Sequence, residues 1–123
     1  IEAGTYFALT SEERAAFEAP FPARITMAAP RMFPSLIADL PGKNLSAWEG
    51  LRNFEKPFLT IIGNNDTGSF GSVENQNYFI ENIPGANGQS HTRLIEAGHF
   101  VQYDQGDEVS RLILEFMVAN PID

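Results

Sequence analysis

The 123-residue chain is 43% hydrophobic and 20% charged, which suits one small globular domain and is too short for two. Eight Lys and Arg against sixteen Asp and Glu give a net charge of −8, which repels phosphate backbones and anionic membrane surfaces. The absence of Cys excludes disulfides, a thiol nucleophile and zinc sites built on thiolates. We therefore expect neither a nucleic-acid nor a membrane partner.

The chain begins at Ile1, without an initiator Met and without the basic and apolar regions of a signal peptide. Its longest apolar run, residues 58–62, is far shorter than the roughly 20 residues that a membrane-spanning helix needs. The cytoplasm is the default location. We expect the chain to be a piece of a longer protein, because the chemistry that it implies is only partly present in it.

The first helix is predicted over residues 11–18. Thr10 and Glu13 have the capping-box spacing, in which each side chain accepts a backbone N–H of the other residue. The helix has to end before Pro20, because the residue before a proline avoids helical angles.

Prolines divide the rest of the N-terminal third into short pieces. A second helix is predicted over residues 22–29, ending before Pro30, and a third short piece begins at Pro34. Short kinked helices have little core of their own, so residues 1–43 are predicted to form a helical cap-like segment. The change of composition at residues 41–44 marks the predicted boundary.

Residues 44–123 are predicted to form a parallel α/β arrangement of helix, strand, helix, strand and helix. The first predicted strand is a short apolar run, the form taken by a strand covered on both faces. The elements are a helix capped by Ser46 that ends before Lys56-Pro57, a strand over 58–62, a helix from Ser72 to Pro84, a strand over 92–96, and a last helix with apolar Val109, Leu112, Ile113, Phe116 and Met117.

Two ionisable residues follow the two predicted strands, Asp66 after the first and His99 after the second. The carboxyl ends of parallel strands meet at one edge of a sheet, where catalytic groups gather. A carboxylate that orients an imidazole is the acid and base pair of a catalytic triad. Alternatively, Asp66 is a turn residue that binds nearby amides, and His99 is a surface turn residue.

Six blocks of sequence carry a resemblance to a known family. They are residues 18–22, 48–51, 56–59, 63–66, 83–86 and 95–102, with Gly98-His99-Phe100 and the last helix as the most specific part. From about Thr10 to Asn120 the chain resembles the C-terminal half of an α/β-hydrolase, and most closely the haloalkane dehalogenases. The resemblance implies the last two parallel strands of that fold with their flanking helices, preceded by the end of a helical cap.

The same resemblance implies that Asp66 is the triad acid and His99 the catalytic base, acting on small apolar substrates. The nucleophile is missing, because no Gly-x-Ser-x-Gly elbow occurs in the sequence. Gly88-Gln89-Ser90-His91 lacks the second Gly and precedes a predicted strand instead of following one. The only Trp, Trp48, is expected to pack in a core, so halide specificity is not supported.

We expect no cofactor and no metal. The stretch Asn64–Gly68 superficially suggests a calcium loop, but Phe70 and Asn77 stand where that loop needs ligands. His91 has no second His at metal-ligand spacing and is expected at the surface.

Two functional hypotheses stay open. The chain is either the acid-bearing and histidine-bearing part of a hydrolase, or a catalytically inactive remnant that acts as a binding or self-associating module. In both cases its apolar strand edge and the apolar side chains of residues 7–33 need a cover. We expect a homodimer or a complex with a missing N-terminal half.

Overall fold

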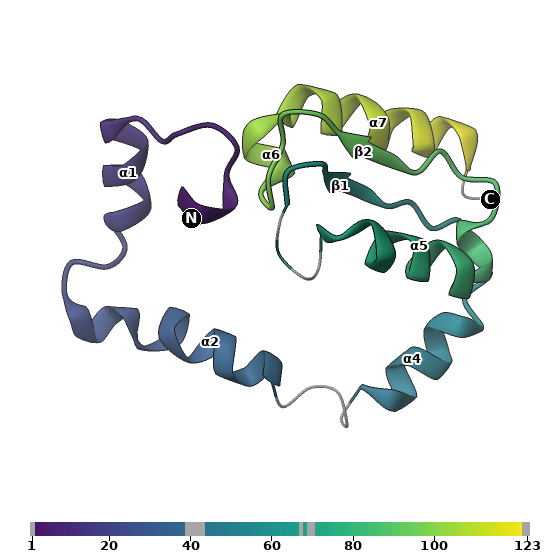
Figure 1. The fold of residues 1–123 in the computed structure, drawn as a ribbon, viewed down its shortest axis with the longest axis horizontal. Helices are drawn as coiled ribbons and strands as arrows, with labels where there is room; N and C mark the ends of the chain where they lie inside the picture. The colour runs from purple at the N-terminus through teal and green to yellow at the C-terminus, as the bar shows by residue number, and fades with distance from the viewer. Residues whose placement is uncertain (1, 39–43, 67, 69–70, 122–123) are drawn as a thin grey trace. The chain divides into compact units, whose positions relative to one another are not determined.

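The computed structural model describes residues 2–38, 44–66, 68 and 71–121 (Figure 1). The chain divides into two compact units. We call residues 9–50 the helical unit, and residues 1–8 with 51–123 the core unit. The boundary predicted at residues 41–44 falls largely outside the described residues and stays a prediction. In the described part of the chain, no helix combines the length and the apolar character needed to cross a membrane.

The helical unit begins with α1 (Ser11–Glu18), as predicted. The Thr10 hydroxyl accepts the N–H of Glu13 at 3.2 Å, and the Glu13 carboxylate accepts the N–H of Thr10 at 2.8 Å. The predicted capping box is thus confirmed. It fixes where the helix starts by using local atoms alone.

One longer helix replaces the two pieces predicted around Pro30. After a short 3-10 turn, η2 (Arg24–Met27), the helix α2 runs from Ala28 to Ala38 with Pro34 inside it. Pro30 lies in the first turn, where the missing N–H of a proline has no intrahelical partner to lose. Pro34 removes one backbone hydrogen bond without ending the helix. The predicted break after Ala29 is therefore wrong.

The next helix, α4 (Leu45–Arg52), begins two residues earlier than predicted. Trp48 donates its backbone N–H to the carbonyl of Asn44 at 2.9 Å. Ser46 therefore lies inside the helix and is not its N-cap.

The core unit is built on two parallel strands, β1 (Ile61–Gly63) and β2 (Thr92–Leu94). Ile61 pairs with Thr92 and Gly63 with Leu94. Figure 1 shows α5 (Val73–Asn82) and α7 (Gly106–Ala119) on opposite sides of these strands. The predicted α/β class with parallel strands is confirmed.

Both strands are shorter than predicted, because residues at one end of each predicted strand adopt other backbone contacts or conformations. Phe58 donates its N–H to Gly85, so the first residues of the predicted strand bind a turn instead of β2. Pairing begins where Thr92 donates to Thr60. The second strand ends at Leu94 because Glu96 has a φ of 56°, in the left-handed region that a strand cannot contain.

The helices of the core unit largely follow the prediction. Ser72 caps α5 by accepting the N–H of Asn75, and the 3-10 turn η4 (Pro84–Ala86) follows it. The four-residue α6 (Val101–Asp104) was not predicted. On α7 the predicted apolar stripe divides: Val109, Leu112 and Phe116 are half-buried, whereas Ile113 and Met117 are exposed.

The buried core of this unit mixes apolar and polar side chains. Ile83 is 1% exposed and lies in the core with Ala86, Leu94 and Ala97. Buried Gln76 donates to the Thr60 hydroxyl at 3.0 Å and to the Thr92 carbonyl at 3.3 Å, which ties α5 to both strands.

His91 is also part of this network. It was expected at the surface, but the structure places it in a partly buried position. Its Nδ1 accepts the backbone N–H of Thr60 at 3.2 Å, and its Nε2 lies 2.8 Å from the carbonyl of Ala86. Because Nδ1 accepts, the ring proton has to be on Nε2, where it is donated to Ala86. His91 is thus a satisfied structural histidine.

Candidate active site

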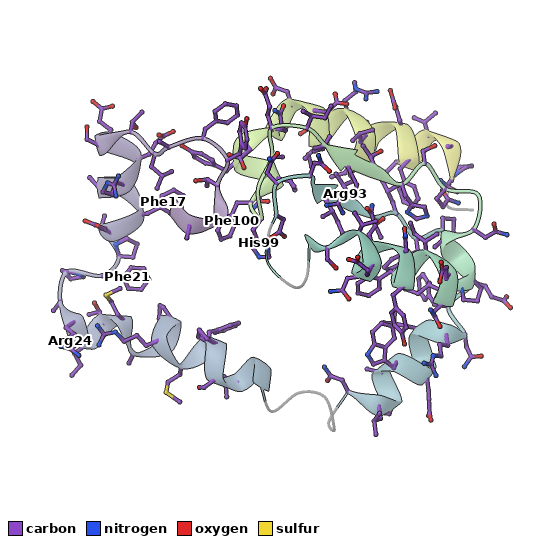
Figure 2. The ribbon with its side chains drawn as sticks, viewed as in Figure 1. Phe17, Phe21, Arg24, Arg93, His99 and Phe100 are labelled. Atoms are coloured by element: carbon purple, nitrogen blue, oxygen red, sulfur yellow. The ribbon has the colours of Figure 1, made fainter. Side chains whose placement is uncertain are left out.

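Asp66 and His99 meet at the carboxyl ends of the two strands. Asp66 follows Gly63, the last residue of β1, and His99 follows Leu94, the last residue of β2. His99 Nδ1 lies 2.9 Å from Asp66 Oδ2. Figure 2 shows His99 beside Phe100, where the chain leaves the strands, and the two rings meet edge to face at 5.2 Å between centroids. The sequence thus predicted correctly that these two side chains come within hydrogen-bond distance.

The surroundings of the pair are asymmetric. The Asp66 side chain is 8% exposed, whereas the His99 side chain is 50% exposed. A carboxylate can only accept, so the bond places the imidazole proton on Nδ1 and leaves Nε2 as the nitrogen that can take a proton. General-base chemistry needs a base that faces solvent and a carboxylate behind it that orients the base. His99 and Asp66 have this arrangement.

Asp66 also has the turn role that the sequence allows as its alternative. Its Oδ1 accepts the N–H of Gly68 at 3.0 Å, while Oδ2 contacts His99. Gly71 packs directly on the carboxylate, since a Cβ built there would lie 2.1 Å from Asp66 Cγ and Oδ2. The two roles are compatible because each uses a different oxygen.

The loop of His99 packs backbone to backbone against the end of β1. A Cβ at Gly63 would lie 2.1 Å from the carbonyl oxygen of Gly98, so only glycine fits there. Asn65 donates its N–H to the carbonyl of Ala97 at 2.9 Å. These contacts hold the loops of the acid and of the histidine together directly.

With this geometry established, comparison with known proteins places the chain. It is 40% identical over 124 residues to a haloalkane dehalogenase of Mycolicibacterium paratuberculosis, 34% over 126 residues to one of Psychrobacter cryohalolentis, and 38% over 121 residues to haloalkane dehalogenase 1 of Mycobacterium tuberculosis. These matches cover 97%, 98% and 94% of this chain. The chain corresponds to the C-terminal part of an α/β-hydrolase.

The resemblance and the fold class expected from the sequence blocks are thereby confirmed. The chain spans about two fifths of the length of these curated relatives, at 40%, 41% and 39%. No protein-family model matches it.

Sequence reasoning missed Asp104, which organises the loop that carries His99. Its Oδ2 accepts the N–H of Gly98 and of Tyr6, both at 2.8 Å, and its Oδ1 accepts the N–H of Phe7 at 3.2 Å. Tyr6 is 98 residues away along the chain. No local pattern marks such a residue, because its partners are backbone groups that only the fold brings together.

A cavity of about 370 Å³ lies next to the acid and histidine. It is lined by Ala3, Gly4, Thr5, Asn65, Asp66, Gly68, Gly98 and His99. A larger cavity of about 760 Å³ lies elsewhere, between Phe54 and the C-terminal end of α7.

Proposed function

We propose that this chain supplies the acid and the histidine of a hydrolase triad that acts on small apolar substrates, haloalkanes or esters. Asp66 and His99 are the proposed residues, and the nucleophile comes from a segment outside these 123 residues. The 2.9 Å contact between His99 Nδ1 and Asp66 Oδ2 is the observation that supports the proposal most directly. We also propose that residues 1–43 are a cap-like segment and residues 44–123 the core part.

The proposed chemistry follows from the proton positions. His99 Nε2 takes a proton from a water that attacks an ester-like covalent intermediate, or from a serine that attacks an ester. The imidazole then carries a positive charge, which the Asp66 carboxylate stabilises through the Nδ1–H bond. When the leaving group departs, Nε2 returns the proton.

The substrate class rests on the relatives and on the composition of the site. The matched proteins are named haloalkane dehalogenases, and haloalkanes are small apolar compounds. Apart from Asp66 and His99, the described lining of the adjacent cavity is neutral, with Asn65 and Thr5 as its larger polar residues. Such a lining disfavours charged substrates, because a charge has to be matched when it leaves water.

A fusion protein tests this proposal. The part of the Mycolicibacterium paratuberculosis enzyme that precedes the matched region is joined to residues 1–123, and short haloalkanes and activated esters are assayed. We expect turnover that falls by a factor of about 10²–10⁴ in His99→Ala, because general-base help is lost. Arg111→Ala, at an exposed position on α7, should leave turnover unchanged. A folded but inactive fusion, or a fully active His99→Ala, would contradict the proposal.

A second candidate is an inactive self-associating module, and exposed apolar side chains favour it. On α7, Leu114 is 62% exposed, Met117 59% and Val118 82%. Contiguous apolar surface of this kind is uncommon on soluble monomers. We propose that the chain pairs as a homodimer or binds its missing N-terminal half through this side of α7.

Light scattering on the purified chain tests that association. We expect a mass of two chains at high protein concentration, and a mass of one chain for Val118→Asp. Ile25→Asp is the matched control, since Ile25 is 83% exposed but lies in the helical unit. A single-chain mass that persists at high concentration would refute the homodimer.

A further inference from the structure

Arg93, in the middle of β2, bonds through its guanidinium to backbone carbonyls on both sides of Asp66 along the chain. One nitrogen, Nη2, donates to the carbonyls of Gly63 at 3.2 Å and of Gly71 at 2.9 Å. Nη1 donates to Gln76 Oε1 at 3.2 Å, and Nε to Asn64 Oδ1 at 3.4 Å. The guanidinium thus bridges the end of β1, the approach to α5 and α5 itself.

Gly63 and Gly71 flank Asp66 on both sides, and each also contacts it. Asp66 donates its N–H to the carbonyl of Gly63 at 3.2 Å. The Cα of Gly71 faces the Asp66 carboxylate so closely that a Cβ would lie 2.1 Å from Oδ2. Nη2 carries two hydrogens, so it can serve both carbonyls at once, and donation from a charged group strengthens each bond.

We propose that Arg93 is a positioning residue for the acid. By holding the carbonyls of Gly63 and Gly71 together, it keeps Gly71 against the Asp66 carboxylate and thereby keeps Oδ2 on His99 Nδ1. The planar fork of arginine suits this task, because it aims fixed donors at several acceptors, which an ammonium group does not. The catalytic meaning of the inference rests on the proposed function; the geometric effect on the Asp66–His99 bond does not.

A merely structural role makes a different prediction. If Arg93 only joins β2 to α5 through Gln76, its loss lowers stability but leaves the folded molecules with an intact Asp66–His99 bond. If Arg93 positions Asp66, the bond weakens in molecules that are still folded. The tautomer of His99 separates the two cases, because the hydrogen bond at one ring nitrogen decides which nitrogen carries the proton.

The experiment is a long-range ¹H–¹⁵N spectrum of the full chain above neutral pH, recorded for the wild type, Arg93→Met and Arg93→Lys. We expect a dominant Nδ1–H form of His99 in the wild type and a fall to less than about half in Arg93→Met, with Arg93→Lys between them. The His91 signals report folding, because His91 bonds to Thr60 and Ala86 through its own tautomer. Arg111→Met is the matched arginine control and should leave His99 unchanged.

An unchanged His99 tautomer in folded Arg93→Met overturns the inference. If Arg93→Met does not fold, Arg93→Lys decides in the same way, since it keeps the charge and loses the fork. The readout needs no turnover. An inactive fusion protein, together with a His99 tautomer that shifts in Arg93→Met, would contradict the proposed function and support the role of Arg93. An active fusion protein, together with an unchanged tautomer, would support the proposed function and contradict the role of Arg93.

Discussion

The helical unit and the core unit are each stabilised internally by a different kind of interaction. Among the described residues of the helical unit only Leu9 is buried. The side-chain bonds between Thr10 and Glu13 in this unit span only three residues. In the core unit, side chains reach across 31 residues, from His91 to Thr60, and across 98, from Asp104 to Tyr6. One unit is specified by local signals, the other by distant partners.

This difference predicts which of the two units contributes more to the free energy of unfolding. Short helices without a packed face are marginal in water, because nucleation is costly and the stabilisation comes mainly from tertiary packing. The exposed apolar residues of the helical unit, among them Phe33 at 67% and Ile25 at 83%, contribute little to stability in this state. Mutations in the core unit should therefore dominate the free energy of unfolding.

The largest effect is expected for Ile83→Ala. Ile83 is 1% exposed, so its truncation leaves a cavity, and the free energy of unfolding should fall by about 2–5 kcal/mol. Urea denaturation followed by circular dichroism measures it. Leu36→Ala, at a 53% exposed position in the helical unit, is the control and should change stability by less than about 0.5 kcal/mol. Equal losses in both variants would remove the distinction between the units.

The second effect concerns the distant bonds of Asp104. Asp104→Asn keeps the shape but turns one acceptor into an NH₂ group that faces backbone N–H donors. Since Oδ1 and Oδ2 both accept such donors, the change should cost about 1–3 kcal/mol. Amide exchange at Tyr6 and Gly98 should accelerate together, although they lie far apart in sequence. Asp107→Asn, on the first turn of α7, is the control; faster exchange at Tyr6 without a change at Gly98 would count against a shared carboxylate.

The predictable features of the fold are those that local chemistry decides. The capping box at Thr10 gave α1 residue for residue, and Ser72 gave the start of α5, because a cap uses atoms only a few positions apart. The meeting of Asp66 with His99 was predictable because each residue follows a predicted strand, and the carboxyl ends of parallel strands share one edge of a sheet.

Other features are not marked by any local sequence signal. The end of β2 depends on the left-handed conformation of Glu96, a non-glycine residue for which no local signal exists. Pro34 lies inside α2, although a proline there predicts the start of a helix. Asp104 and Arg93 act on backbone carbonyls and amides, which are present at every position, so residue type alone could not single them out.

A smaller effect is expected for Thr10→Ala in the helical unit. Loss of the cap should cost about 1 kcal/mol of local helix stability. Because α1 is held locally, only the amides of residues 11–18 should exchange faster, while those of β1 and β2 stay unchanged. Ser11→Ala, at the neighbouring hydroxyl, is the control. A change in the strand amides would show that this unit is coupled to the sheet more strongly than its local bonding implies.

The smallest effect is expected on the exposed surface of α7, where Arg111 pairs with Glu108 and Glu115. Hydrogen bonds from the guanidinium lower the pKa of the Glu108 carboxyl below its ordinary value of 4.5. A depressed carboxyl pKa adds stability above 4.5, and this stability is lost as the pH falls through the lowered value. Arg111→Met should therefore have a slightly lower Tm than the wild type at pH 7 and an equal Tm at low pH. The pair is exposed and screened by salt, so the difference at pH 7 should also vanish at high ionic strength. A difference that persists in salt would mean that Arg111 stabilises α7 by packing and not by charge.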